Sequence, residues 1–240
     1  MTDQILLSIV IPALNEEKTI GTVIEKALRS IQTLNISAEI IVVDNGSSDQ
    51  TYSISQAHKV CVVKISKQGY GNALQHGFSK AKGKYILMAD ADDSYNLEYI
   101  KPFIDQLDAG YNLVIGNRFK GTFVPGAMPW LHRYIGTPVL TFIVNMLFQI
   151  RIGDLNCGMR AIRNETYRNL QCKSPGMEFA TEMIIKAAIK KLRITEIPCT
   201  LYKDKRNRPP HLKTWSDGWR HLKLILWSFW HNNYGERPSK

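Results

Sequence analysis

Apolar and polar residues alternate in regular blocks through the first half of the chain. The run LLSIVIP (6–12) is almost entirely apolar, as a strand buried on both faces of a sheet would be. Behind it, apolar residues recur every three or four positions from Ile20 to Leu34, which predicts a helix, and Asn15 is placed to cap its start. Further strands are expected at 39–44, 59–65, 84–90 and 112–117, and further helices at 47–57, 70–81 and 97–107. Repeated strand–helix units of this length indicate an α/β fold with a doubly wound, mostly parallel sheet.

The regular alternation stops after residue 117. Glycines and prolines predict a loop over 118–129. The uncharged segment 134–150 is about long enough to cross a bilayer, yet it contains Pro138 and several polar residues, and we favour a helix that lies in the plane of an interface or in the core. The remaining expected elements are a helix (174–192), a strand (193–202), a basic loop (203–213) and a helical tail with four tryptophans, Trp215, Trp219, Trp227 and Trp230.

The composition is that of an ordinary globular protein. Of the 240 residues, 44% are hydrophobic and 22% are charged, which suits one large domain or two small ones. We expect one domain over 1–212 and a Trp-rich amphipathic segment over 213–240. The four cysteines lack zinc-site spacing, so we expect free, buried thiols in a reducing compartment. The N-terminus lacks the basic region of a signal peptide and is expected to form the first strand.

The net charge of +10 predicts an anionic partner. Nucleic acid, anionic lipid and a phosphorylated substrate all have the required charge, and the total by itself does not choose among them. Basic residues are densest from Lys186 to the C-terminus. No nucleic-acid recognition motif is present, and tryptophans on an apolar helical face suit a membrane better than single-stranded RNA.

Acidic and amide side chains follow three of the expected strands. Asn15 and Glu16 follow the first, Asp44 ends the second, and Asp90 and Asp92 follow the fourth. Ligands of open α/β sheets bind outside the carboxyl ends of the strands. We therefore expect these side chains to form one rim, which would suit a cation and a polar ligand.

The densest acidic stretch of this rim is MADADDSY (88–95), where Asp93 adds a third carboxylate to Asp90 and Asp92. Carboxylates this close repel one another. They are able to bind a cation together, or to cap a helix that starts near Tyr95. One acidic residue is enough for a cap, so we favour the cation.

Seven segments of the chain occur in the order found in family 2 glycosyltransferases. They are SIVIPALNEE (8–17), IVVDNGSSDQT (41–51), GNALQHG (71–77), MADADDS (88–94), GNRFKG (116–121), PWLHR (129–133) and DLNCGMR (154–160). The chain resembles this family from about Ser8 onward, and most closely the branch that makes polyprenyl-phosphate sugars, which includes dolichol-phosphate mannose synthases. The resemblance implies the GT-A fold, with a Rossmann-like half that binds a nucleotide sugar (1–117) and an acceptor half (118–212).

The resemblance also implies roles for individual residues. Asp90 and Asp92 match the family's DxD motif, which binds Mg²⁺ or Mn²⁺, with Asp92 as the more direct ligand. The residues at nucleotide-binding positions are Pro12, Ala13, Asn15, Glu16, Asp44, Gly69, Asn72, Asp90 and Ala91. The residues at catalytic positions are Asp92, Asp154, Arg118 and Arg133, and those at acceptor-phosphate positions are Arg118, Arg133, Lys205 and Arg206.

Several of these roles have a structural alternative. Asn15 equally suits a helix cap, and Asp44 equally suits a turn with the Asn-Gly pair that follows it. Asp154 is a general base if the acceptor is a hydroxyl, but it only orients a reactant if the acceptor is a lipid phosphate, which is already an oxyanion. Glu178 and Glu182, in the family-like segment GMEFATEM, equally suit surface positions.

The resemblance implies an inverting, metal-dependent hexosyltransferase. It would move a hexose from a nucleotide sugar to polyprenyl or dolichyl phosphate at the cytoplasmic face of a membrane, with a UDP-sugar favoured over GDP-mannose as the donor. Many relatives carry membrane-spanning helices after the catalytic domain. No such helix is expected in this chain up to Lys240, so a homo-oligomer or a membrane subunit could supply them. The alternative acceptor is a glycan hydroxyl. A nucleic-acid-binding module is a remote third hypothesis, which the acidic rim opposes.

Overall fold

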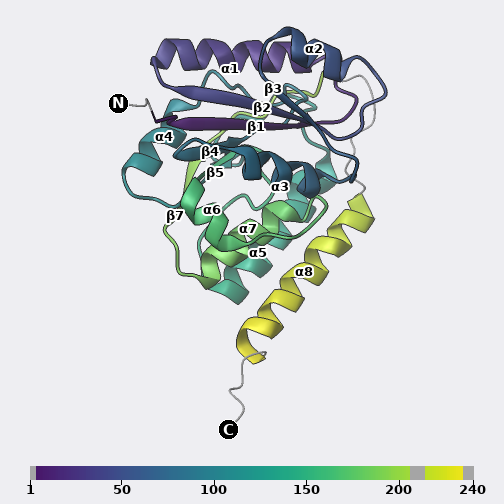
Figure 1. The fold of residues 1–240 in the computed structure, drawn as a ribbon. Coiled ribbons are helices and arrows are strands. Elements are labelled where there is room, and N and C mark those ends of the chain that lie inside the picture. The colour runs from purple at the N-terminus through teal and green to yellow at the C-terminus, as the bar shows by residue number, and fades with distance from the viewer. Residues whose placement is uncertain (1–3, 206–213, 235–240) are drawn as a thin grey trace.

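The structure, a computed structural model, describes residues 4–205 and 214–234 (Figure 1). A seven-stranded sheet forms its centre, with the strand order β3-β2-β1-β4-β6-β5-β7. Strand β6 runs antiparallel to its neighbours β4 and β5, and the other strand pairs are parallel. The mostly parallel α/β sheet predicted from the sequence is confirmed.

Strands and helices alternate regularly down to β5 and less regularly after it. The strands are β1 (Leu7–Ala13), β2 (Ala38–Asp44), β3 (Cys61–Lys64), β4 (Tyr85–Met88), β5 (Leu113–Asn117), β6 (Arg160–Arg163) and β7 (Ile194–Pro198). The helices are α1 (Ile20–Leu34), α2 (Thr51–Ala57), α3 (Tyr70–Lys80), α4 (Lys101–Asp108), α5 (Thr137–Phe148), α6 (Asn164–Leu170), α7 (Phe179–Ile189) and α8 (Thr214–Tyr234). A π-helical turn, η1 (His132–Gly136), leads directly into α5.

Helices cover both faces of the sheet. In Figure 1, α1 and α2 lie above it, and α3, α6 and α7 lie below it. Helices α5 and α8 pack on α7 and on each other, which adds an outer layer below the sheet. The predicted domain boundary at 212–213 lies outside the described residues.

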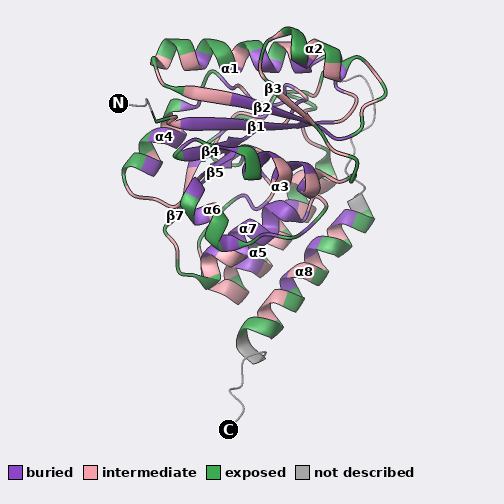
Figure 2. Ribbon diagram, in the orientation of Figure 1, coloured by how far each residue is buried: buried purple, intermediate pink, exposed green. Residues whose placement is uncertain are grey.

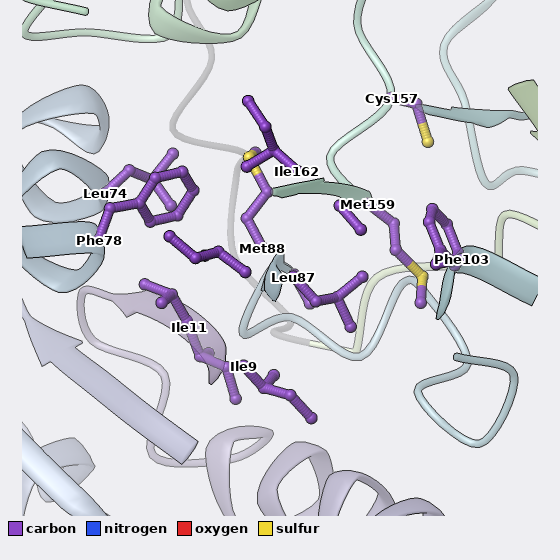
Figure 3. Close-up of a cluster of buried hydrophobic side chains, with 14 of the residues drawn as sticks. Ile9, Ile11, Leu74, Phe78, Leu87, Met88, Phe103, Cys157, Met159 and Ile162 are labelled. Atoms are coloured by element: carbon purple, nitrogen blue, oxygen red, sulfur yellow. The ribbon is translucent and has the colours of Figure 1, made fainter. Parts of the chain in front are cut away.

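The core lies on both faces of the central strands. All residues of β1, β4 and β5 are buried, as their continuous apolar runs predict (Figure 2). Below the sheet, Phe78 of α3 lies near Met88 (Figure 3). A Cβ added to Gly77 would lie 2.4 Å from Val10 Cγ1, so the missing side chain lets α3 pack closely on β1.

The second half contains two elements that the sequence analysis did not predict, β6 and α6. Strand β6 has only four residues, three of them buried, and a segment this short shows no usable periodicity. The helix expected at 174 begins at Phe179, and the helix expected at 97 begins at Lys101. Of the four cysteines, Cys61 is exposed, contrary to the expectation, while the other three are buried.

The predicted helix cap at Asn15 is wrong. Helix α1 begins at Ile20, and its N-cap is Thr19, which makes no side-chain capping hydrogen bond. Asn15 has a left-handed backbone conformation, with φ of 54°, and its Oδ1 accepts a hydrogen bond from the Ser48 N–H at 2.8 Å. The side chain therefore joins the ends of β1 and β2, and this contact between distant segments replaces the local cap.

Helices α5 and α8 expose large apolar side chains. On α5, Val139, Phe142 and Met146 are 49%, 65% and 59% exposed, and their spacing places them on one face. On α8 the exposed residues are Trp215, Trp219, Leu226, Trp227 and Trp230. Within residues 4–205 and 214–234, no helix combines the length and the apolarity needed to cross a membrane.

Candidate active site

The carboxyl ends of β1, β2 and β4 meet at one edge of the sheet, as predicted. Ala13 pairs with Asp44 across β1 and β2, and Val10 pairs with Met88 across β1 and β4. Because these strands are parallel neighbours, the residues that end or follow them share one rim. Pro12, Ala13 and Ala91, which were predicted to bind the nucleotide, are buried in this rim.

Asp90 and Asp92 line a cavity of about 990 Å³ beside the rim. Arg118 lines the same cavity from the end of β5. Apolar side chains of η1, α5 and α8 complete the wall, among them Ile135, Val139, Leu140, Ile143, Trp219 and Leu222. The cavity thus combines two carboxylates, a guanidinium group and an extended apolar lining.

The two carboxylates are held in place by neighbouring groups. The Tyr70 hydroxyl donates a hydrogen bond to Asp90 Oδ1 at 2.7 Å, and the Ser94 N–H donates one to Asp92 Oδ1 at 3.0 Å. Burial, followed by the charge of Asp90, raises the pKa of Tyr70 well above its ordinary value, so the phenol stays a donor. A Cβ added to Gly158 would lie 1.9 Å from Asp90 Oδ2. The loop that carries Gly158 therefore packs directly against this carboxylate.

The third carboxylate, Asp93, points away from this pair. Its side chain is fully buried and forms ion pairs with Lys26 of α1 and with Lys205, the latter at 2.6 Å. Two lysines thus offset its charge. The next helix, α4, begins at Lys101 and has no side-chain cap. The alternative that these acids cap a helix near Tyr95 is therefore wrong.

The pair formed by Asp90 and Asp92 fits a hard divalent cation. Mg²⁺ and Mn²⁺ bind to one or two carboxylates and complete their shells with water and phosphate oxygens. Both carboxylates line a cavity that is large enough to admit such ligands. In the described part of the chain, no group of three or more His, Cys, Asp or Glu side chains is able to enclose an ion. A cation at this pair would therefore complete its shell with water and with the oxygens of a bound phosphate.

The polar residues that follow β1 and β2 contact the loop after β2. Asp44 is 1% exposed and accepts a hydrogen bond from the Ser47 N–H at 3.0 Å, as the turn alternative predicts. The Asn15 N–H donates to Ser47 Oγ at 2.9 Å. Asn15, Glu16 and Asp44 do not line the main cavity. A nucleotide-binding role for these three residues stays a prediction.

The glycines at the start of α3 allow two loops to approach closely. A Cβ added to Gly69 would lie 2.4 Å from Pro175 O, and one added to Gly71 would lie 2.1 Å from Ser174 O. The Asn72 N–H donates a hydrogen bond to Pro175 O at 3.1 Å. Packing thus accounts for both glycines, and binding of a nucleotide by Gly69 and Asn72 stays a prediction.

A buried carboxylate anchors the loop before α7. Glu182 accepts hydrogen bonds from the Lys173 and Ser174 N–H groups and pairs with Lys186 at 2.8 Å. Burial alone would raise the pKa of Glu182, but these donors lower it on balance. Glu178 is 8% exposed, and its Oε2 has no hydrogen-bond partner among the described residues. The alternative that both glutamates are surface carboxylates is therefore wrong.

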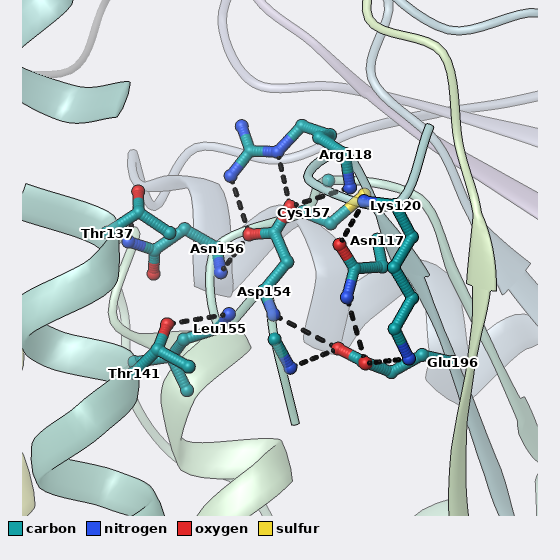
Figure 4. A network of polar contacts seen from close by, with 12 residues as sticks. Asn117, Arg118, Lys120, Thr137, Thr141, Asp154, Leu155, Asn156, Cys157 and Glu196 are labelled. Carbon is teal, nitrogen blue, oxygen red and sulfur yellow. Dashed lines mark hydrogen bonds and ion pairs between the residues drawn. The ribbon is translucent and has the colours of Figure 1, made fainter. Parts of the chain in front are cut away.

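Arg118 and Asp154 form a buried, bidentate ion pair in the wall of the cavity (Figure 4). Arg118 donates from Nε to Asp154 Oδ2 at 2.6 Å and from Nη2 to Oδ1 at 2.8 Å. The backbone N–H groups of Arg118 and Asn156 donate to the same carboxylate. Asp154 is 0% exposed and does not line the cavity, whereas Arg118 and Asn156 do. The carboxylate thus faces the guanidinium and not the cavity.

Glu196 of β7 holds the backbone of the turn that carries Asp154 (Figure 4). Its carboxylate accepts hydrogen bonds from the N–H groups of Gly153 and Asp154 at 2.7 and 3.0 Å, and from Asn117 Nδ2 at 2.9 Å. Lys120 pairs with it at 3.2 Å. The turn that carries Asp154 is therefore fixed to the ends of β5 and β7.

The other basic residues predicted to bind phosphate do not join Arg118. The π-helical turn η1 places His132 in the main cavity but Arg133 in a neighbouring pocket of about 520 Å³. There the Arg133 guanidinium lies 4.3 Å from the centre of the Phe123 ring. Lys205 pairs with Asp93, and the predicted phosphate contact Arg206 lies outside the described residues. Phosphate binding by Arg133 and Lys205 stays a prediction.

Sequence reasoning missed several residues that line the cavity. Tyr70 and His132 are adjacent to residues that it selected, and Asn156 is two positions after Asp154. His132 and Asn156 fall inside the family-like segments PWLHR and DLNCGMR. His221 of α8 gave no such signal. It lines the cavity and shares a hydrogen bond of 2.6 Å with Thr181 Oγ1. Burial, and then the charge of Arg118, lowers the pKa of His132, and burial also lowers the pKa of His221.

Comparison with known proteins gives matches over most of the chain. Residues 8–171 match the model of glycosyl transferase family 2. The low-salt glycan biosynthesis hexosyltransferase Agl6 of Haloferax volcanii is 35% identical over 221 residues, which are 92% of this chain and 53% of that protein. The dolichyl-phosphate hexose transferase of the same organism is 30% identical over 194 residues, which are 80% of this chain and 81% of that protein. The chain thus spans about half the length of the first of these relatives.

The fold also matches solved structures. Glucosyl-3-phosphoglycerate synthase from Mycobacterium tuberculosis, crystallised with Mn²⁺, UDP-glucose and phosphoglyceric acid, superposes with a TM-score of 0.71 at 23% identity. The match covers 93% of this chain and 79% of that one. At this level of identity, the similarity bears on the fold alone.

Proposed function

The chain belongs to glycosyl transferase family 2, and we propose that it transfers a hexose from a nucleotide sugar to a polyprenyl or dolichyl phosphate at a membrane surface, with inversion at the anomeric carbon. The observation that carries this proposal is the mixed lining of the main cavity. Asp90 and Asp92 suit a cation-bound diphosphate, Arg118 suits a phosphate, and the apolar wall suits a prenyl chain.

Asp90 and Asp92 are the residues that would hold Mg²⁺ or Mn²⁺. When bound, such a cation neutralises the donor diphosphate and the charge that develops on the leaving nucleotide. The hydrogen bonds from Tyr70 and Ser94 keep the two carboxylates oriented before any ligand arrives. The solved structure named above, whose fold this chain shares, was crystallised with Mn²⁺ and UDP-glucose, so this fold is able to hold both a cation and a UDP-sugar donor.

The rim beside β1 and β2 is the proposed site of the nucleoside. Asn45, adjacent to Asp44, is 5% exposed, and its Oδ1 has no hydrogen-bond partner among the described residues. A buried amide oxygen without a donor is costly unless a ligand supplies one. Both uracil and guanine carry ring N–H donors, so this atom suits either base, and GDP-mannose stays the second donor.

Arg118 is the proposed phosphate contact of the acceptor. A guanidinium group suits the oxygens of a phosphate, and its bond to Asp154 fixes its direction. A phosphate oxyanion needs no base to become a nucleophile, so positioning and charge compensation suffice. Because both Asp154 oxygens are already bonded to Arg118, we assign Asp154 a positioning role rather than proton transfer.

The exposed apolar faces of α5 and α8 are the proposed membrane contact. Tryptophan is favoured at bilayer interfaces, and Lys and Arg are favoured near anionic headgroups. On α8, Trp219 and Trp227 lie close to Arg220 and Lys223, which are exposed as well. The name of the dolichyl-phosphate hexose transferase relative supports a lipid acceptor.

A second acceptor, a glycan hydroxyl, has one observation in its favour. A hydroxyl acceptor needs a base in the cavity. His132 lines the cavity, and its lowered pKa keeps the imidazole neutral near pH 7. Replacing His132 with Asn distinguishes the two acceptors, because only a hydroxyl acceptor depends on this base.

A panel of donors and acceptors tests the proposal. UDP-glucose, UDP-N-acetylglucosamine, UDP-galactose and GDP-mannose, each radiolabelled in the sugar, are incubated with undecaprenyl or dolichyl phosphate and Mn²⁺. Label that enters the organic phase supports the proposal, and it identifies donor and acceptor together. Label that enters only added glycans would favour the second acceptor, and no label in either would contradict both.

A further inference from the structure

Two of the three buried cysteines lie against the same point of the sheet. A Cβ added to Gly116 of β5 would lie 2.7 Å from Cys157 Sγ and 3.2 Å from the Cβ of Cys199. The two side chains also interact with each other through a hydrogen bond. The sequence separates these residues by more than forty positions and gave no sign that they meet.

The backbone fixes both cysteines at this point. The Cys199 N–H donates a hydrogen bond to Asn117 O at 3.0 Å, which extends the pairing of β5 with β7 by one residue. On the other side of β5, the Gly116 N–H donates to Met159 O at 2.9 Å, which holds the loop that carries Cys157. The two thiols occupy the space that a side chain at position 116 would take.

The pair lies between two walls of the main cavity. Cys157 lines the cavity in the loop that contacts Arg118 (Figure 4). The next residue of this loop, Gly158, packs against Asp90. Cys199 begins the segment whose next residues, from Leu201 to Asp204, line the same cavity. Cys157 has no solvent-exposed area, so a reagent in the cavity is able to reach its sulfur only when the loop that carries Cys157 moves.

The two thiols differ in reactivity. Burial would raise the pKa of Cys157, but the hydrogen bond with Cys199 lowers it on balance. The same hydrogen bond, together with burial, raises the pKa of Cys199. Since the thiolate is the attacking form, and since Cys157 lines the cavity while Cys199 does not, Cys157 is the sulfur that reacts first.

We propose that Cys157 and Cys199 form a redox-active thiol pair, which closes to a disulfide when a low-molecular-weight disulfide enters the cavity. The Cys157 thiolate attacks one sulfur of the reagent, whose S–S bond breaks and whose other half leaves and takes up the proton lost by Cys157. Cys199 then attacks the Cys157 sulfur of this mixed disulfide and releases the second half of the reagent, which takes the Cys199 proton. The reagent is reduced to two thiols as the pair is oxidised to one disulfide.

This bond would tie the loop next to Arg118 to the segment that follows β7. Both segments line the cavity, so the disulfide restricts their movement when a ligand enters. We expect the oxidised protein to lose most of its transferase activity and to regain it with dithiothreitol. This readout rests on the proposed function, whereas the chemistry of the thiols does not.

The test uses a variant that retains only this pair. Cys61→Ser and Cys172→Ser remove the exposed thiol and the buried thiol that follows α6. The folded protein is incubated with bis(2-hydroxyethyl) disulfide, and the reaction is quenched with acid. The protein is then unfolded in denaturant that contains N-ethylmaleimide, which labels free thiols, and its mass is measured by mass spectrometry. The expected product has lost two hydrogen atoms, carries no adduct, and takes up two maleimides after reduction. Adding Cys199→Ser should instead trap one hydroxyethylthio group on Cys157.

Three results would overturn the proposal. The first is a folded protein in which both thiols remain free and are labelled only after unfolding. The second is a product with a separate adduct on each cysteine. The third is a Cys199→Ser variant whose Cys157 stays unmodified, since the first step then does not occur. If the disulfide forms and the transfer rate does not change, the proposed effect of the disulfide on the cavity is wrong.

Discussion

Arg118 and Asp154 form a two-point ion pair, with distances of 2.6 and 2.8 Å, in which the carboxylate is fully buried while the guanidinium lines the main cavity. A buried charge that loses its partner costs about 3–5 kcal/mol, whereas replacing both partners with apolar residues can be nearly neutral. The pair therefore explains why an acid is needed at a position that does not face the cavity.

Removing the carboxylate alone is expected to destabilise the protein more than removing both partners. Asp154→Asn should lower the free energy of unfolding by about 3 kcal/mol or more, because Arg118 is left buried without its counter-ion. The double variant Asp154→Leu, Arg118→Met should lose less. Urea denaturation of the two proteins measures the difference. Equal losses, or a stable Asp154→Asn protein that has lost only its activity, would favour a catalytic base over a positioning role.

Asp92 and Asp93 are neighbours with opposite environments, so their variants form a matched pair. Asp92→Asn removes a proposed cation ligand, and the transfer rate should fall about a hundredfold or more. Asp93→Asn removes the partner of Lys26 and Lys205 and should lower stability. The Mn²⁺ concentration for half-maximal transfer should rise only in the first variant. If Asp93→Asn raises that Mn²⁺ concentration as much as Asp92→Asn does, the assignment of Asp92 rather than Asp93 as a cation ligand is wrong.

A methyl group at residue 158 should displace the neighbouring carboxylate. The Cβ of Gly158→Ala would lie 1.9 Å from Asp90 Oδ2, so Asp90 has to move. A displacement of about 1 Å at a catalytic group is able to cost about a hundredfold in rate. Steady-state kinetics with varied Mn²⁺ measure the effect, and circular dichroism checks the fold. A folded variant with the normal rate and Mn²⁺ dependence would show that the position of Asp90 is unimportant.

One exposed side chain of α5 tests the membrane contact. Phe142 is 65% exposed, and Phe142→Asp should weaken binding to vesicles of phosphatidylglycerol and phosphatidylcholine by about tenfold, since burial of a phenylalanine contributes about 1.5–3 kcal/mol. The matched control is Leu28→Asp, because Leu28 is exposed on α1, across the sheet from α5 (Figure 1). Sedimentation at physiological salt measures both. Equal loss in the two variants, or no binding by the parent protein, would contradict the proposed surface.

His221 should make the stability depend on pH. Its ring bonds to Thr181, and burial lowers its pKa although the charges of Glu178 and Asp217 oppose the shift. The unfolded chain therefore binds the proton more strongly, and the free energy of unfolding should fall as the pH drops below about 6.5. In His221→Gln this fall should be shallower, as measured by urea denaturation between pH 5 and pH 8. An unchanged slope would indicate that other groups cause it.

The sequence predicted the sheet because its signals are local. Continuous apolar runs, such as LLSIVIP, are typical of strands that are buried on both faces. The segments between these runs have the apolar spacing of helices, and strands that alternate with helices are compatible with few topologies other than a parallel sheet. The acidic rim followed from the same pattern, since parallel neighbours end at one edge. Short elements such as β6 gave no signal, because four residues are too few for a period to show.

The sequence by itself determined the fold class, the rim and the presence of an acidic pair. Local apolar runs set the strands, parallel neighbours end at one edge, and the paired acids are two positions apart in the chain. Only the tertiary structure decided which partner each charged group faces. It gave Asp93 two lysines, one 67 and one 112 positions away, it placed Asp154 behind Arg118, and it brought Cys157 to Cys199. Such pairings depend on how distant segments are packed, because a buried charge is costly unless the packing gives it a partner.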